Sequence, residues 1–169
     1  PALSIVGRGP AGRAGRKLGV LLTDGADAEL FEALSNAAVK AGATVEVIAP
    51  KIAGAILSDG ALAPAKQKID GGPSVLFDAV AVLASADGAA LLAMDAAAKD
   101  FVSDAFAHCK FIAYTPEAEP LFAKAGLAAD LDDGCFPLAR GRDAKAFIEA
   151  CAPLRYWPRE LKVDLDAVS

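Results

Sequence analysis

Short apolar runs alternate along this chain with longer segments in which apolar residues have helical spacing. Residues 18–22 and 44–49 are apolar runs of strand length. Between them, apolar residues recur every three or four positions from Leu30 to Ala41, and Gly42 ends the segment. The pattern predicts a strand, a helix and a second strand, which form a β-α-β unit with a right-handed crossover between parallel strands.

The alternation continues to the end of the chain. An Asp-Gly pair at 59–60 lies between the short apolar runs 55–57 and 61–63 and predicts a small β-hairpin. Further strands are predicted at 79–84 and 111–114, a turn at 87–88, and helices at 96–109, 115–126 and 143–152. Strands that alternate with helices predict an α/β fold with a doubly wound parallel sheet, so we expect a flavodoxin-like, three-layer α/β/α sandwich.

The length of 169 residues predicts one domain, over 17–169. Residues 1–16 contain four glycines, two prolines and three arginines, which favours a linker that leads into the domain. No signal peptide or membrane-spanning run is predicted. A first residue other than methionine leads us to expect an excised fragment or a processed product. The scattered cysteines, which we expect to be reduced thiols, favour a cytoplasmic location.

The net charge of −5 and the pI near 4.9 argue against a nucleic-acid or membrane partner. Three cysteines in scattered positions and one histidine provide no zinc site, no haem motif and no other cofactor site. We expect the cysteines to be reduced cytosolic thiols. No glycine-rich phosphate loop follows a predicted strand.

The segment around Thr115 and Pro116 has the strand–turn–helix order on which many α/β enzymes carry a nucleophile. Such an elbow needs Ser or Cys at the turn and a backbone N–H directly after it. Pro116 has no N–H, and it is no nucleophile itself. We therefore expect a vestigial elbow without catalytic residues, with Thr115 as the N-cap of the following helix and Pro116 at its first position.

Other candidates for chemistry are carboxylates and thiols. Asp27 lies at the start of the first predicted helix, where a carboxylate complements the helix dipole, and we favour that role over acid–base catalysis. His108 and Cys109 are adjacent in a predicted helix and so do not face each other. Cys135 is the best candidate for an exposed thiol, but its acidic neighbours predict a raised pKa and low reactivity.

Two further hypotheses concern binding. Asp24, Asp27, Ser85 and Thr115 all follow predicted strands, where they could form a small-ligand site. The aromatic segment 156–159 is either an anchor for a partner or a contact that holds the tail on its own domain.

The order of strands and helices resembles the DJ-1/PfpI, class I glutamine amidotransferase-like superfamily, which carries a cysteine at the elbow and an acidic partner at the first helix. Thr115 (or Pro116) and Asp27 match those positions, so the resemblance implies a vestigial nucleophile and a vestigial acid. The chain more closely resembles the C-terminal domain of large-subunit haem catalases. The matching segments are 1–4, 16–25, 58–60 with 64–65, 72–80 and 154–159.

That resemblance implies a parent that decomposes hydrogen peroxide at haem, in a core that lies outside this chain. It implies the catalase core and tetramer neighbours as partners and a structural, stabilising or chaperone-like role, with unfolded client proteins as further partners. Two alternatives stay open. One is a free-standing cysteine hydrolase or glyoxalase-like enzyme of the DJ-1/PfpI type that uses Cys135 or Cys109, and the other is a small-ligand binding module.

Overall fold

A computed structural model describes residues 15–160 as a parallel β-sheet between two layers of helices. The prediction of a linker at 1–16 therefore lies almost wholly outside the described residues. All neighbouring strands of the sheet are parallel, in the order β5-β2-β1-β6-β7-β8. The strands are β1 (Lys17–Leu22), β2 (Thr44–Ala49), β5 (Gln67–Lys68), β6 (Ala79–Leu83), β7 (Ile112–Tyr114) and β8 (Cys135–Pro137). The predicted three-layer sandwich is confirmed.

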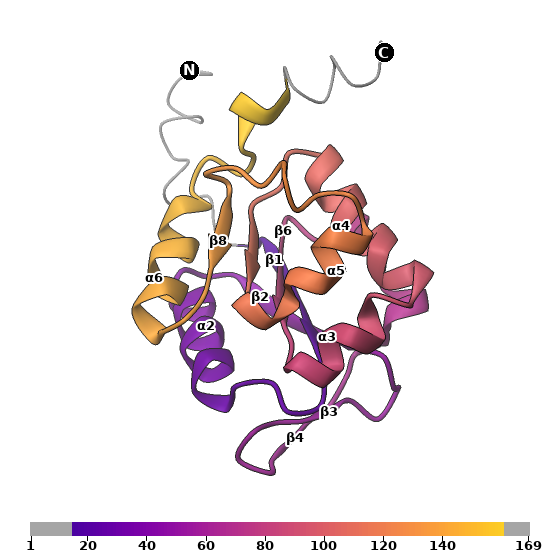
Figure 1. Ribbon diagram of the computed structural model, residues 1–169. Coiled ribbons are helices and arrows are strands. Elements are labelled where there is room, and N and C mark those ends of the chain that lie inside the picture. The colour runs from indigo at the N-terminus through magenta and orange to yellow at the C-terminus, as the bar shows by residue number, and fades with distance from the viewer. Residues whose placement is uncertain (1–14, 161–169) are drawn as a thin grey trace.

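Helices cover both faces of the sheet (Figure 1). One face carries α2 (Ala28–Lys40) and α6 (Gly141–Ala150), and the other carries α3 (Ala86–Leu92), α4 (Ala96–Ala107) and α5 (Glu119–Lys124). Side chains that alternate along each strand feed two separate cores, because successive residues point to opposite faces. In β1, Val20 packs with α2 and α6, whereas Leu21 packs with the α3–α5 layer.

The β3–β4 hairpin, with strands Ala55–Ile56 and Leu62–Ala63, leaves the sheet at its carboxyl edge, where the parallel strands end. The opposite, amino edge holds the first described residues and the 3₁₀ turn η5 (Trp157–Arg159). Figure 1 shows the hairpin at the bottom and η5 at the top of the molecule. The two edges are therefore separate surfaces.

Several predicted elements need correction. The Asp-Gly pair at 87–88 is not a turn but lies inside α3, where Ser85 is the N-cap. Gly88 is needed there because a Cβ would overlap Thr23. The predicted helix 115–126 is a 3₁₀ turn, η4 (Pro116–Ala118), followed by the short α5. Two more 3₁₀ turns, η2 (Ile69–Gly71) and η3 (Ser74–Leu76), and the edge strands β5 and β8 were not predicted.

Candidate functional site

The carboxyl edge of the sheet is the site that this fold uses for ligands. Three of the predicted polar residues, Asp27, Ser85 and Thr115, line one pocket of about 430 Å³ there, together with Pro116. Asp24 lies instead along a neighbouring pocket of about 570 Å³, which shares Ser85. The structure thus brings Asp27, Ser85 and Thr115 together in one pocket, as expected from the sequence, but it does not place Asp24 there.

Thr115 follows β7 and is buried, with 3% of its surface exposed. Its Oγ1 accepts a hydrogen bond from the backbone N of Ala84 and donates one to the carbonyl of Ala84, both at 3.1 Å. The hydroxyl is therefore fully engaged with the end of β6. A nucleophilic hydroxyl is activated by donating its hydrogen bond to a base. Thr115 instead donates to a backbone carbonyl, so it is not an activated nucleophile.

The prediction that Thr115 caps a helix is only partly right. Thr115 occupies the N-cap position of the 3₁₀ turn η4, but its side chain makes no capping hydrogen bond, because Ala84 uses it. Pro116 begins the turn as predicted. Since proline lacks an N–H, the position directly after Thr115 offers no donor to a developing oxyanion.

Asp27 lies across the same pocket and has a structural role. Its Oδ1 accepts a hydrogen bond of 3.0 Å from the backbone N of Leu30, which makes it the N-cap of α2. Ser58, from the hairpin, accepts a hydrogen bond from the N of Ala28 at the same helix start. These contacts agree with the helix-dipole role favoured from the sequence.

Asp24 and Ser85 join the hairpin to the sheet. The Asp24 carboxylate binds Lys51 Nζ at 2.6 Å and accepts a hydrogen bond of 2.9 Å from the N of Ile56 in β3. The Lys51 hydrogen bond, reinforced by the one from Ile56, lowers the pKa of Asp24. Ser85 Oγ donates to the Asp24 carbonyl at 2.7 Å and accepts from Gly88. Both side chains are thus used to hold loops.

The cysteines lie away from this edge. Cys135 starts β8 opposite Ile112, and Cys109 precedes β7, so both are near the amino ends of strands. The prediction that Cys135 is exposed is wrong, since 7% of its surface is accessible. Burial raises the pKa of its thiol to about 11, although a backbone hydrogen bond at Asp132 and the charge of Arg159 act in the opposite direction. His108 is exposed whereas Cys109 is buried, so they do not form a catalytic pair.

A buried cluster around Arg159 holds the segment 156–159 on its own domain, which was one of the two hypotheses for this segment; its partner Asp132 was not anticipated. The Arg159 side chain is inaccessible and forms a two-pronged ion pair with Asp132, at 2.7 and 2.8 Å. It also donates to the carbonyls of Phe106 and Lys110 and lies 4.3 Å from the Phe106 ring. Asp132 is far from Arg159 in sequence, and their pairing carries no local signal.

Lys110 is a second buried cation that the sequence analysis missed. Its Nζ donates a 2.6 Å hydrogen bond to the Ser74 carbonyl, and 2% of the residue is exposed. Burial, followed by the charge of Arg155, lowers its pKa to about 8. The strand-like sequence around Lys110 gave no reason to place this charged side chain inside the protein.

Within residues 15–160, no group of three or more His, Cys, Asp or Glu side chains is arranged to hold a metal ion. No helix in the same range has both the length and the apolar character needed to cross a membrane. At the carboxyl edge, the Asp27 carboxylate and the Ser85 hydroxyl line the pocket, and each already accepts a hydrogen bond from a backbone N–H.

Solved structures with the same fold come from DJ-1 proteins. Oxidized Toxoplasma gondii DJ-1 superimposes with a TM-score of 0.70 at 15% identity, over 91% of this chain and 98% of that one. Drosophila melanogaster DJ-1beta gives 0.68 at 16% identity, over 90% and 97%. Identities this low show a shared fold and no more.

Sequence relatives are more specific. The chain is 51% identical to Catalase C of Rhizobium meliloti over 165 residues, which are 98% of this chain and 23% of that protein. It is 30% identical to Catalase HPII of Pseudomonas putida over 95% of this chain and 22% of the relative. The chain thus spans less than a quarter of each of these two relatives. A family described as the C-terminal domain found in long catalases matches residues 14–160. The chain belongs to this family of long-catalase C-terminal domains.

Proposed function

We propose that the chain is the non-catalytic C-terminal domain of a long, cytoplasmic catalase, with a structural and stabilising role. In this proposal the parent decomposes hydrogen peroxide to water and oxygen at haem, in the part of the protein that precedes this domain. The observation that carries the proposal is the elbow, where Thr115 Oγ1 is occupied by Ala84 and Pro116 has no N–H. A stabilising domain needs neither a nucleophile nor an oxyanion hole.

Among the described residues, the two tyrosines and the histidine have surroundings that do not fit a haem group. Haem needs an axial ligand beside a flat apolar slot. Tyr114 packs its ring 5.0 Å from Phe122, and Tyr156 packs 5.9 Å from Phe111, so core rings occupy the space beside both phenols. His108 is exposed at the end of α4. In this proposal, the haem of the parent is held by residues outside this chain.

Truncation of the parent catalase before residue 15 tests the proposal. The truncated protein should retain its peroxide turnover per haem, because the proposal places the cofactor outside this chain. Compared with the full-length catalase, it should lose activity at a lower temperature, and its tetramer should dissociate at a lower denaturant concentration. Activity decay on heating and sedimentation measure these effects, and unchanged heat resistance with unchanged assembly would contradict the stabilising role.

A chaperone-like role toward unfolded clients is a second candidate, supported by exposed apolar residues at the carboxyl edge. Leu91 is 71% exposed and lines the 570 Å³ pocket beside the hairpin, where Ile56 and Leu62 are 51% and 55% exposed. Exposed apolar patches mark sites of interaction with other proteins, which in this proposal are unfolded clients. The isolated chain should slow the aggregation of a heated client protein, and Leu91→Ser should weaken the effect. Equal aggregation with and without the chain would exclude the role.

The two alternatives from other classes have direct tests. A glyoxalase-like enzyme would convert methylglyoxal and lose that activity on Cys135→Ala or Cys109→Ala. The burial of both thiols, far from Thr115, argues against this outcome. A ligand-binding module would show a raised unfolding temperature in a screen of small polar molecules, and Ser85→Ala would remove the rise.

A further inference from the structure

Three arginines fix the C-terminal segment to the amino edge of the sheet. Arg16, just before β1, donates to the carbonyls of Cys151 and Ala152 at 2.7 and 3.1 Å. Arg155 donates to the carbonyl of Asp78 at 3.1 Å, and Arg159 donates to that of Lys110 at 2.8 Å. The place where the chain enters the domain and the segment 151–159 are therefore held together as one surface.

Trp157 is presented on this surface by the residues around it. Tyr156 packs edge-on against Phe111, and Arg159 is fully buried, so the backbone on both sides of Trp157 is fixed. Trp157 itself is 57% exposed. An exposed tryptophan on a rigid turn has little conformational entropy to lose on binding, and tryptophan is the residue type most enriched in binding hot spots.

Further apolar residues lie on the same edge. Val75 and Leu76, in η3, are 64% and 46% exposed. Lys110 connects η3 to η5, because its Nζ binds the Ser74 carbonyl and its own carbonyl binds Arg159. We call the set Val75, Leu76, Leu154 and Trp157 the amino-edge face.

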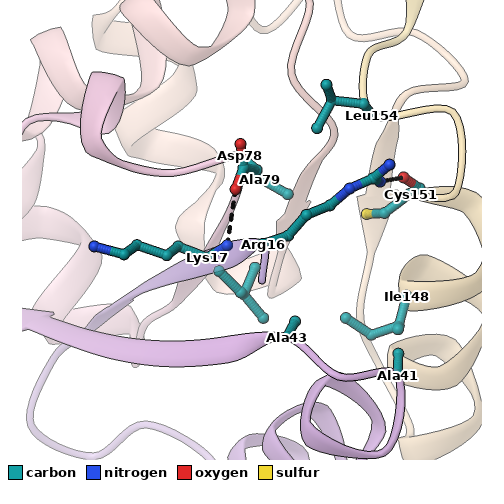
Figure 2. Close-up of a pocket in the computed structure, with 10 residues that line it drawn as sticks. Arg16, Lys17, Ala41, Ala43, Asp78, Ala79, Ile148, Cys151 and Leu154 are labelled. Atoms are coloured by element: carbon teal, nitrogen blue, oxygen red, sulfur yellow. Dashed lines mark hydrogen bonds between the residues drawn. The ribbon is translucent and has the colours of Figure 1, made fainter. Parts of the chain in front are cut away.

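A small notch completes the face (Figure 2). Its volume is about 30 Å³, enough for the tip of one apolar side chain, and its lining is almost wholly apolar. The apolar residues that line it include Ala43, Ala79, Ile148 and Leu154. Figure 2 shows that the backbone N of Lys17 donates a hydrogen bond to the Asp78 carboxylate and that the Arg16 side chain donates one to the Cys151 carbonyl. Residues 16–17, where the chain enters the domain, therefore border the notch.

The position of this chain within its relatives indicates what covers the face. The chain matches less than a quarter of Catalase C, and the family consists of C-terminal domains, so the remainder of such a protein comes before residue 15. That part joins the domain at Arg16, beside the notch. A tethered partner has a high effective concentration, so a small apolar face is sufficient for docking.

We propose that the amino-edge face is the docking surface for the preceding part of the same long-catalase polypeptide, with Trp157 as the anchor of the contact. This inference rests on the proposed function and adds the place of contact. The complementary surface is apolar at its centre and inserts one apolar side chain into the notch. The carboxyl edge, with the hairpin, faces away from this contact.

Hydrogen exchange of the full-length catalase, compared with the isolated chain, tests the location. Amides at 75–77 and 154–157 should exchange at least about tenfold more slowly in the full-length protein, whereas hairpin amides at 55–63 should exchange equally in both. Equal exchange at 75–77 and 154–157 in the two proteins would overturn the proposal. The truncation experiment would still decide the stabilising role independently.

Trp157→Ala tests the anchor, and Leu62→Ala is its matched control, since Leu62 is similarly exposed at 55% but lies at the carboxyl edge. In the full-length protein, Trp157→Ala should return exchange at 75–77 to the rate of the isolated chain, and Leu62→Ala should not. In the isolated chain, Trp157→Ala should leave the unfolding temperature unchanged. If Trp157→Ala lowers the unfolding temperature of the isolated chain as much as that of the full-length protein, then Trp157 stabilises the domain itself and is not the anchor. The double variant Val75→Ser, Leu76→Ser provides a second test of the face.

Discussion

Arg159 is the residue whose removal should affect the fold most. Its guanidinium is buried, and it neutralises Asp132 while it satisfies two backbone carbonyls. Removing one member of a buried ion pair leaves the other charge uncompensated, which costs about 3–5 kcal/mol. Arg159→Ala should therefore lower the free energy of unfolding by that amount in urea denaturation. Arg142→Ala, at an exposed position in α6, is the control and should change it by less than about 0.5 kcal/mol.

Thr115 offers a prediction that separates a structural from a chemical role. Thr115→Val keeps the shape but leaves the N and carbonyl of Ala84 without their partner, at a cost of about 1–3 kcal/mol. Thr115→Ser keeps the hydroxyl and should recover most of that loss. Thermal unfolding of the two variants provides the measurement, and equal stability would show that the hydrogen bonds contribute nothing.

Lys110 should give the stability of the protein a dependence on pH. Its pKa is about 8 when folded and near 10.5 in an unfolded chain, mainly because the side chain is buried. Between these values the unfolded state binds more protons, so the free energy of unfolding rises with pH. Cys135 acts in the opposite direction above about pH 9, because its folded pKa is about 11.

The comparison of wild type with Lys110→Met from pH 7 to pH 9 isolates this effect, since Cys135 contributes equally to both. Denaturation in urea should show that wild type gains stability relative to the variant as the pH rises. A constant difference across this range would show that Lys110 does not titrate there.

At the scale of elements, the β3–β4 hairpin depends on Asp24 for its attachment. The carboxylate binds Lys51, which precedes β3, and the N of Ile56 within β3. Asp24→Ala should speed hydrogen exchange of the amides at 55–63. Exchange in β1 and β6 should stay slow, because these strands are hydrogen-bonded to each other along their length. Asp70→Ala is the matched control, since Asp70 forms an exposed pair with Lys68 at 3.6 Å.

The elements that the sequence predicted are those with a long periodic signal. β1, β2, β6 and α2 contain enough buried positions for a pattern to stand out. β5 and β8 have two and three residues, and β8 ends in a proline, so their pairing is set by the sheet beside them. α3 was hidden by an Asp-Gly pair whose glycine is required by contact with Thr23.

The candidate site was predictable where it depends on residue type alone. Pro116 lacks an N–H in any structure, and Asp27 at a helix start is a good N-cap in any helix. The engagement of Thr115 with Ala84 depends on the register of β7 beside β6, which only the tertiary structure supplies. Cys135 likewise contacts Arg159, which is 24 residues away in the sequence, and packs in the core beneath α3–α5.

At the scale of the whole molecule, one sheet joins two cores that do not touch each other directly. Leu34 belongs to the core beneath α2 and α6, and Leu92 to the core beneath α3–α5. β1 contributes side chains to both cores. Unfolding of one helix layer would therefore expose β1, against which the other layer packs. We therefore expect the domain to unfold in one cooperative step, which is usual for single domains of this size.

Leu34→Ala and Leu92→Ala test this coupling, because each leaves a cavity in one core only. Both leucines are fully or almost fully buried, and each substitution should cost about 2–5 kcal/mol. In urea, far-ultraviolet circular dichroism and the fluorescence of Trp157 should report the same midpoint for each variant. The double variant should lose the sum of the two costs within about 0.5 kcal/mol, since the two sites share no side-chain contacts across the sheet. Separate transitions for the two probes would show that the domain does not unfold in one cooperative step.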